Sequence, residues 1–152
     1  MTSEPTRRDT SLPPGASALG YGGLVPFVAA VLGIALLEGE NRLLAVRALL
    51  AYGAVILSFL GAVHWGLVLA RPPADAARRL LAGVLPALAG WVALLLPARF
   101  GLALLVVAFG AFWLYEHRVL GEKLLPVSYL GLRRSLTLGV CSLLTLGLIA
   151  HG

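Results

Sequence analysis

Charged residues are scarce in this sequence. Only 12% of the 152 residues are Asp, Glu, Lys or Arg, whereas soluble domains carry about 25%. Hydrophobic residues make up 59% of the chain, and the mean hydropathy is +0.92. A chain of this composition cannot hide all its apolar surface in its own core, so lipid must cover part of it. The composition excludes an ordinary soluble domain.

Cysteine is also nearly absent, since Cys141 is the only one. An intramolecular disulfide and a cysteine-based zinc site are therefore excluded within one chain. Cys141 lies in an apolar stretch, which favours a small core residue. Phosphate-binding loops, nucleophile elbows, zinc-protease motifs and dinucleotide fingerprints are missing too. We expect no cofactor, and a non-enzymatic protein is favoured over an enzyme.

Long basic runs are missing, although the net charge is +5 and the pI is about 10.1. A basic protein can bind nucleic acid, but no run here is long enough to follow a phosphate backbone. The basic residues instead lie between apolar stretches, where Lys and Arg set the orientation of membrane proteins. We expect a lipid bilayer as the partner, not nucleic acid.

Five apolar stretches are close to the ~20 residues that cross a bilayer as a helix. The sequence therefore predicts an all-α, polytopic integral membrane protein with five transmembrane helices. Residues 1–18 are polar and rich in Ser, Thr and Pro, which predicts a disordered tail before a membrane domain over 19–152. The expected spans are about 19–37, 48–70, 80–96, 98–116 and 135–150, with a kink near Pro26.

Basic residues are distributed unevenly between the two sides. Three are expected on the side of the carboxyl terminus, Arg42, Arg47 and Arg99. Nine are expected on the other side, Arg7, Arg8, Arg71, Arg78, Arg79, Arg118, Lys123, Arg133 and Arg134. Short loops rich in Lys and Arg stay cytoplasmic, which predicts a cytoplasmic N-terminus and an outside C-terminus. A cell inner membrane is the expected location, and the mitochondrial inner membrane is the alternative.

The second span, 48–70, contains no charged residue and is rich in small ones. Small residues along one face let helix backbones approach closely in lipid. One such ribbon recurs every four residues, and Gly61 adds a small residue beside His64. The predicted helix-packing residues are Ala54, Ser58, Gly61, Ala62 and Gly66.

His64 lies six residues before Ala70, roughly 9 Å along the helix from the predicted cytoplasmic end. Glu116 and His117 end the fourth span on the same side, so these residues, with Tyr52 and Ser58, form a candidate functional polar cluster. Ionisable residues inside membranes are often functional, and a His–Glu pair could relay a proton. The structural alternative is a neutral His64 that bonds to a neighbouring helix. No metal site is predicted, because adjacent residues point to divergent faces of a helix.

Two adjacent cations precede the last predicted span. Arg133 and Arg134 are candidate ligands of anionic lipid headgroups, since each basic residue near a membrane surface contributes about 1 kcal/mol. Plain orientation signals are the alternative interpretation.

The run from Tyr52 to Gly66, YGAVILSFLGAVHWG, resembles the motif of an uncharacterised family, domain of unknown function 3429. That family includes the eukaryotic group named transmembrane protein 69. Leu132-Arg133 and Leu136-Thr137 look like its second hallmark, a Leu-Arg and then a Leu-Thr entering the last helix. Glu116 stands where the family usually has Asp. The resemblance covers most of the chain from Leu19 and implies a helical membrane fold, but no established activity.

Three functional hypotheses remain open at this point. The leading one is a non-enzymatic packing or assembly partner of other membrane proteins, or of a second copy. The alternative is a small transporter or channel with a polar path around His64. A membrane enzyme or metal carrier that uses His64 and Glu116 is the third.

Overall fold

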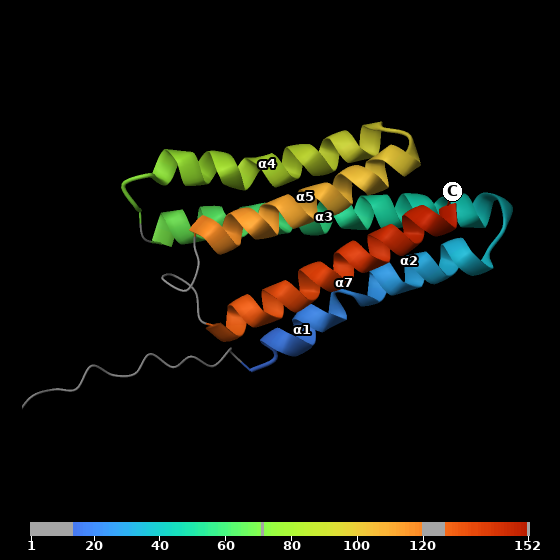
Figure 1. Cartoon of the computed structure of the whole chain (residues 1–152), viewed down its shortest axis with the longest axis horizontal. Helices are drawn as coiled ribbons and strands as arrows, with labels where there is room; N and C mark the ends of the chain where they lie inside the picture. Colours follow the sequence, from blue (N-terminus) through green and yellow to red (C-terminus); the bar gives the residue numbers. More distant parts are fainter. Residues whose placement is uncertain (1–13, 71, 120–126, 152) are drawn as a thin grey trace, which may run out of the picture.

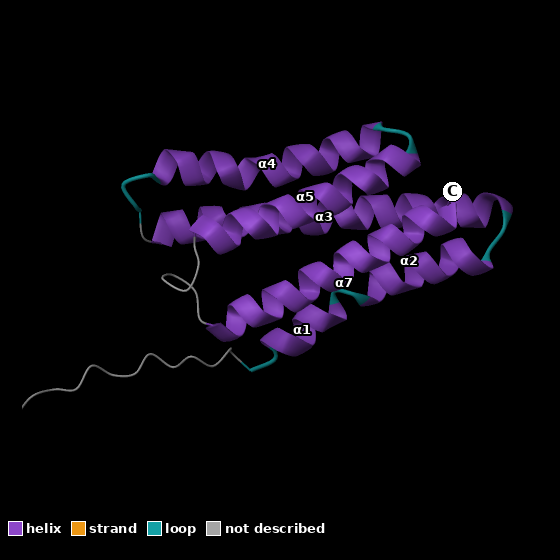
Figure 2. Cartoon of the chain, viewed as in Figure 1, coloured by secondary structure: helices purple, strands orange, loops and turns teal. Residues whose placement is uncertain are grey.

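The chain forms a bundle of antiparallel helices (Figure 1). The computed structural model describes residues 14–70, 72–119 and 127–151, and these residues contain no strand (Figure 2). The helices are α1 (Ala16–Gly22), α2 (Val25–Leu36), α3 (Gly39–Ala70), α4 (Ala76–Leu95), α5 (Ala98–Val119) and α7 (Val127–His151). With α1 and α2 taken as one rod, the described residues contain five helices that are long and apolar enough to cross a membrane. The predicted fold class is confirmed.

Two helices extend well beyond the predicted spans. Helix α3 begins at Gly39, so most of the expected loop 38–47 is helical, and α7 begins at Val127 instead of residue 135. Both extensions contain arginines that find partners inside the bundle. Arg42 donates a hydrogen bond to the carbonyl of Ala150, and Arg133 pairs with a carboxylate of α5. Because these two arginines have partners in the bundle, they lie within helices and not in the expected loops.

The first rod is broken between α1 and α2, three residues before the expected kink at Pro26. Pro26 lies in the first turn of α2, where a missing backbone N–H costs nothing. The break lies at Gly23 and Leu24, between the two helices. The Tyr52 hydroxyl of α3 donates to the carbonyl oxygen of Gly23 at 3.1 Å. Of the predicted tail 1–18, residues 16–18 belong to α1, and 1–13 lie outside the described residues.

Helix α3 is the centre of the bundle and packs against α2, α4, α5 and α7. Its closest neighbour is α4, because glycines meet at the crossing. A methyl group on Gly61 would collide with the carbonyl oxygen of Gly83, and one on Gly90 would lie 3.2 Å from the Ala54 side chain. The backbones of α3 and α4 therefore approach each other closely, as small residues permit in membranes.

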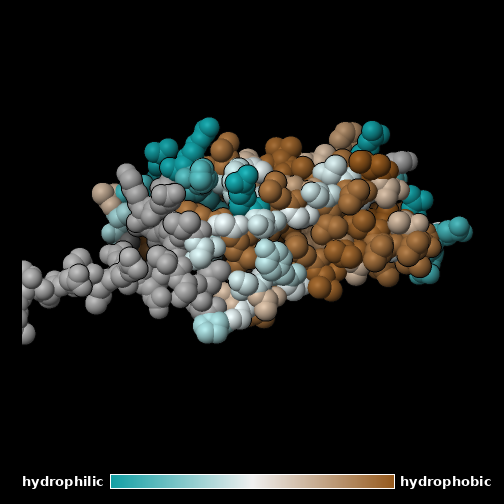
Figure 3. Space-filling view, turned by 60° about the horizontal axis from the view of Figure 1, so that its bottom comes forward, coloured by the Kyte–Doolittle hydropathy of each residue, from teal (hydrophilic) through white to brown (hydrophobic). Residues whose placement is uncertain are grey.

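The apolar core fills the half of the bundle that contains the α2–α3 and α4–α5 turns. Its fully buried side chains come from α2, α3, α4, α5 and α7 and include Ile34, Leu49, Leu57, Ala93, Leu102, Leu105 and Leu144. Outside this core, hydrophobic side chains cover much of the face in Figure 3, and hydrophilic ones gather toward the two ends of the bundle. Lipid-exposed flanks between polar ends are what a membrane-spanning bundle requires.

Candidate functional site

A buried ion pair joins α5 to α7 near the end of the bundle where α1 begins. Glu116 of α5 is 5% exposed and Arg133 of α7 is 7% exposed. Arg133 Nε donates to Glu116 Oε2 at 2.9 Å, and Arg133 Nη2 lies 2.8 Å from the same oxygen. Each ion neutralises the other, since a lone buried charge would be far more costly.

Thr137 completes the environment of the guanidinium. Arg133 Nη1 donates to Thr137 Oγ1 at 2.9 Å, and Thr137 is itself 4% exposed. The two residues are four apart, so they share one face of α7. The same face carries Tyr129 one turn earlier. Because α7 begins before Arg133, the helical repeat places this arginine on the face of α7 that points into the bundle.

His64 of α3 faces the free oxygen of Glu116. Its side chain is 1% exposed, and Nδ1 lies 4.0 Å from Glu116 Oε1. Neither ring nitrogen has a hydrogen-bond partner among the described residues. The rings of Phe112 and Tyr115 surround the imidazole at centroid distances of 5.1 and 5.8 Å. A movement of about 1 Å would let an Nδ1–H donate to the carboxylate, given hydrogen-bond lengths near 3 Å.

The structure thus brings two residues of the predicted polar cluster together, His64 and Glu116, and separates the other three. Tyr52 caps the break in the first rod, as described above. The Ser58 hydroxyl donates to the Ala54 carbonyl of its own helix at 2.8 Å. His117 is exposed and stacks on Trp113, with ring centroids 5.7 Å apart. These three side chains do not extend the polar cluster.

The predicted headgroup ligands have different environments. Arg133 is buried against Glu116, and its headgroup role stays a prediction. Arg134 is exposed at the same level of α7, and its headgroup role stays a prediction. A signal for the difference was present in the sequence, because Arg133 shares the face of Tyr129 and Thr137, whereas Arg134 lies about 100° further around the helix.

The predicted packing residues fall into two sets. Ala54 and Gly61 are buried against α4, and Ser58 is partly buried. Ala62 and Gly66 are exposed, and nothing lies within 4 Å of a methyl group placed on Gly66. The ribbon is therefore split between a contact inside the bundle and a surface.

Among the described residues, no group of three or more His, Cys, Asp or Glu side chains gathers in a way that could hold a metal ion. The site contains one carboxylate, one guanidinium, one imidazole and one hydroxyl. Such a set can hold a proton or donate hydrogen bonds. It defines a membrane protein with a buried polar cluster near one end of the bundle.

Comparison with known proteins places this membrane protein in a family. Residues 12–149 match the family described as "Protein of unknown function (DUF3429)", and the chain belongs to that family. It is 41% identical over 85 residues to transmembrane protein 69 of Xenopus tropicalis, a match over 55% of this chain. The matched part is 33% of that relative's length. No solved structure matches the chain.

Proposed function

We propose that this protein is a non-enzymatic packing or assembly partner of other membrane proteins, with α3 as its contact helix. The observation that carries the proposal is a continuous exposed stripe on α3, here called the α3 stripe. Its members are spaced by three or four residues along the helix. They are Leu44, Ala48, Ala51, Val55, Phe59, Ala62, Gly66 and Leu69, all exposed.

The composition of the α3 stripe favours a helix over lipid as its neighbour. Its spacing follows the repeat of about 3.6 residues per turn, so its members form one continuous face of α3. Half of the stripe is Ala or Gly, and small residues mark helix contacts in membranes because they let backbones approach closely. The occupant is a helix of another membrane protein or of a second copy.

Cysteine cross-linking in native membranes tests this proposal. In a Cys141→Ala background, Ala62→Cys is expected to give adducts of defined mass with a short bifunctional maleimide, and added Gly66→Leu should abolish them. Gly131→Cys is the matched control, because Gly131 is also exposed and has nothing within 4 Å of an added methyl group. Equal adducts at both positions, or none at Ala62→Cys, would refute the contact.

We also propose an inner-membrane location with the α1 end of the bundle in the cytoplasm. Four exposed or partly exposed arginines support this orientation, Arg78, Arg79, Arg118 and Arg134. Three basic residues, Arg42, Arg47 and Arg99, lie at the other end. Because Lys and Arg concentrate on the cytoplasmic side, a reporter active only outside should be active after residue 152 and inactive in the α3–α4 loop. The reverse pattern would overturn the orientation.

The alternative is a small transporter or channel, and one observation favours it. His64 has two unpartnered ring nitrogens beside Glu116, and unpaired polar groups in membranes often lie on ion pathways. Beyond His64, however, Leu57 and Leu105 are fully buried, so conduction would need another conformation. His64→Leu should abolish a proton flux into vesicles if this alternative holds, and an unchanged flux would reject it.

A further inference from the structure

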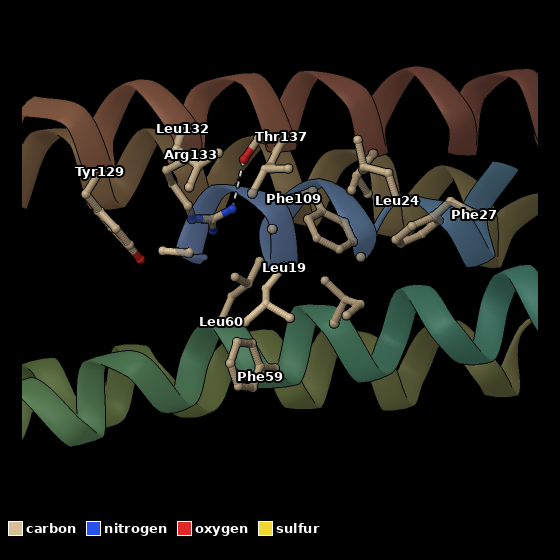
Figure 4. A pocket seen from close by; sticks show the side chains of 16 residues that line it. Leu19, Leu24, Phe27, Phe59, Leu60, Phe109, Tyr129, Leu132, Arg133 and Thr137 are labelled. Carbon is tan, nitrogen blue, oxygen red and sulfur yellow. Dashed lines mark hydrogen bonds between the residues drawn. The ribbon is translucent and has the colours of Figure 1, made fainter. Parts of the chain in front are cut away.

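A cavity of about 390 Å³ lies between α7 and the first rod on one side and α3 and α5 on the other. Figure 4 shows that side chains of these helices point into it. Leu19 and Phe59 line it and are 80% and 65% exposed, whereas Phe27 and Phe109 line it at 1%. The cavity therefore runs from the lipid-facing surface into the bundle, and a ligand enters it from the bilayer.

One wall of the cavity is polar and the others are apolar. Tyr129, Arg133 and Thr137, a row along one face of α7, supply the polar groups (Figure 4). The remaining walls carry aliphatic and aromatic side chains of the first rod, α3 and α5. A long apolar wall with a short polar row is complementary to an amphiphile, since binding sites combine apolar lining with few polar groups that fix orientation.

The polar row has hydrogen-bond donors to spare. An arginine has five N–H groups, and Arg133 uses Nε on Glu116 and Nη1 on Thr137. Nη2 lies 2.8 Å from Glu116 Oε2, so one N–H group on each of Nη1 and Nη2 stays without an acceptor among the described residues. The Tyr129 hydroxyl also donates to no acceptor among the described residues. A ligand that supplies acceptor oxygens would satisfy these groups.

The net charge of the Arg133–Glu116 pair determines which acceptor group of a ligand fits the cavity. Glu116 already neutralises Arg133 at 2.8 Å, so a second carboxylate would bring an uncompensated negative charge into an apolar cavity. A carbonyl oxygen accepts hydrogen bonds without adding charge. The neutral carbonyl is therefore the polar group that fits.

The size of the cavity suits a small amphiphile. Its volume of about 390 Å³ lies within the range of small-ligand pockets, about 300–1,000 Å³. A single flexible chain can therefore follow its apolar wall.

We propose that this cavity binds one neutral, carbonyl-bearing amphiphile, with the carbonyl on Arg133 and Tyr129 and the chain along α3 and the first rod. Two sources share this chemistry, the acyl ester of a glycerolipid and the ring ketone of a prenylated quinone. The site is distinct from the α3 stripe, although Phe59 borders both.

Native mass spectrometry of the delipidated full-length protein tests the proposal with three probes, dioleoylglycerol, a prenylated benzoquinone and oleate. One molecule of dioleoylglycerol or of the quinone should bind, and the stronger of the two identifies the source. Preferred binding of oleate, which is anionic, would overturn the assignment of a neutral carbonyl. Absence of binding by any probe would overturn the site.

Two variants locate the bound molecule. Leu60→Trp fills the cavity and should reduce binding at least tenfold, whereas Leu85→Trp is the matched control on a second, smaller cavity between α4 and α5. Tyr129→Phe removes one donor without changing the fold and should weaken binding about fivefold, the effect of one neutral hydrogen bond. If Leu60→Trp does not fold, Tyr129→Phe decides alone. Binding that Tyr129→Phe leaves unchanged would contradict the pose.

Discussion

The two halves of the bundle are held together in different ways. In the half with the α2–α3 turn, side chains such as Leu49, Leu105 and Leu144 are fully buried, and a methyl group on Gly53 would lie 2.8 Å from Leu105. In the other half, α7 and α5 are joined through Glu116 and Arg133, and a cavity separates α7 from α3. We call these the packed half and the polar half.

The difference shows where such a bundle can carry a ligand or a moving proton. Close packing is what stabilises helices in lipid, because water supplies no hydrophobic drive between them. The polar half gives up part of this packing and contains a charge pair, an unpartnered imidazole and unsatisfied donors. Functional sites are expected where a protein departs from close packing and from full hydrogen bonding of buried polar groups. The polar half is such a region.

The largest effect is expected from Arg133→Met. It leaves the Glu116 carboxylate buried without its cation, which costs about 3–5 kcal/mol when one partner of a buried pair is removed. Denaturation of the purified protein in mixed micelles measures the loss. Arg134→Met is the matched control, because Arg134 is exposed, and it should change the free energy of unfolding by less than about 0.5 kcal/mol. Equal losses of stability in the two variants would show that the buried ion pair does not stabilise the polar half.

A cavity-forming substitution in each half sharpens the comparison. Leu105→Ala in the packed half should cost about 2–3 kcal/mol, the lower part of the range for buried leucines, because apolar transfer contributes little in lipid. Leu60→Ala, on the wall of an existing cavity, should cost less than half as much. The same micelle denaturation compares them, and a larger loss for Leu60→Ala would contradict the assignment of the halves.

Glycine contacts between α3 and α4 give a smaller effect. Gly61→Ala should cost about 1–2 kcal/mol, within the range for overpacking, because the added methyl group would meet the Gly83 carbonyl oxygen. Gly66→Ala has open space around it and should leave the thermal midpoint in detergent unchanged. If both variants melt alike, the close approach of α3 and α4 is not a source of stability.

The smallest effect concerns the exposed loop before α4. Arg79 Nε donates to Asp75 Oδ2 at 3.1 Å, and this hydrogen bond lowers the pKa of Asp75 from its ordinary value of 3.8. A lowered folded-state pKa adds stability above the unfolded pKa, which is lost as the pH falls through the folded value. Asp75→Asn should therefore flatten the acid side of the stability profile very slightly, since exposed pairs contribute little. A large change above pH 5 would be contrary to this expectation.

The sequence predicted the five-helix fold because long apolar stretches directly report helices that cross lipid. It also singled out His64 and Glu116, since ionisable residues in such stretches are conspicuous. It missed Arg133 as the partner of Glu116, because an arginine near a span end looks like a loop charge until the helix start is known. Helix α7 begins at Val127, before Arg133, and once that start is known the shared face of Tyr129, Arg133 and Thr137 places the arginine toward the bundle.

The packing ribbon illustrates the same limit. Periodicity placed Ala54, Ala62 and Gly66 on one side of α3, but it could not say which neighbour each would meet. The position of α4, set by Gly83 and Gly90, buries Ala54 and leaves Gly66 exposed. A surface for partners became visible only when the internal contacts were known.

The central claim is that a charge pair joins α7 to α5 in the polar half, where a cavity separates α7 from α3, and a double-mutant cycle tests it most directly. The cycle compares Glu116→Gln, Arg133→Gln and the double variant by denaturation in mixed micelles. We predict a coupling energy of at least about 2 kcal/mol, with the double variant more stable than Arg133→Gln alone, because contacting charges are strongly non-additive. Losses that add within about 0.5 kcal/mol would contradict the claim.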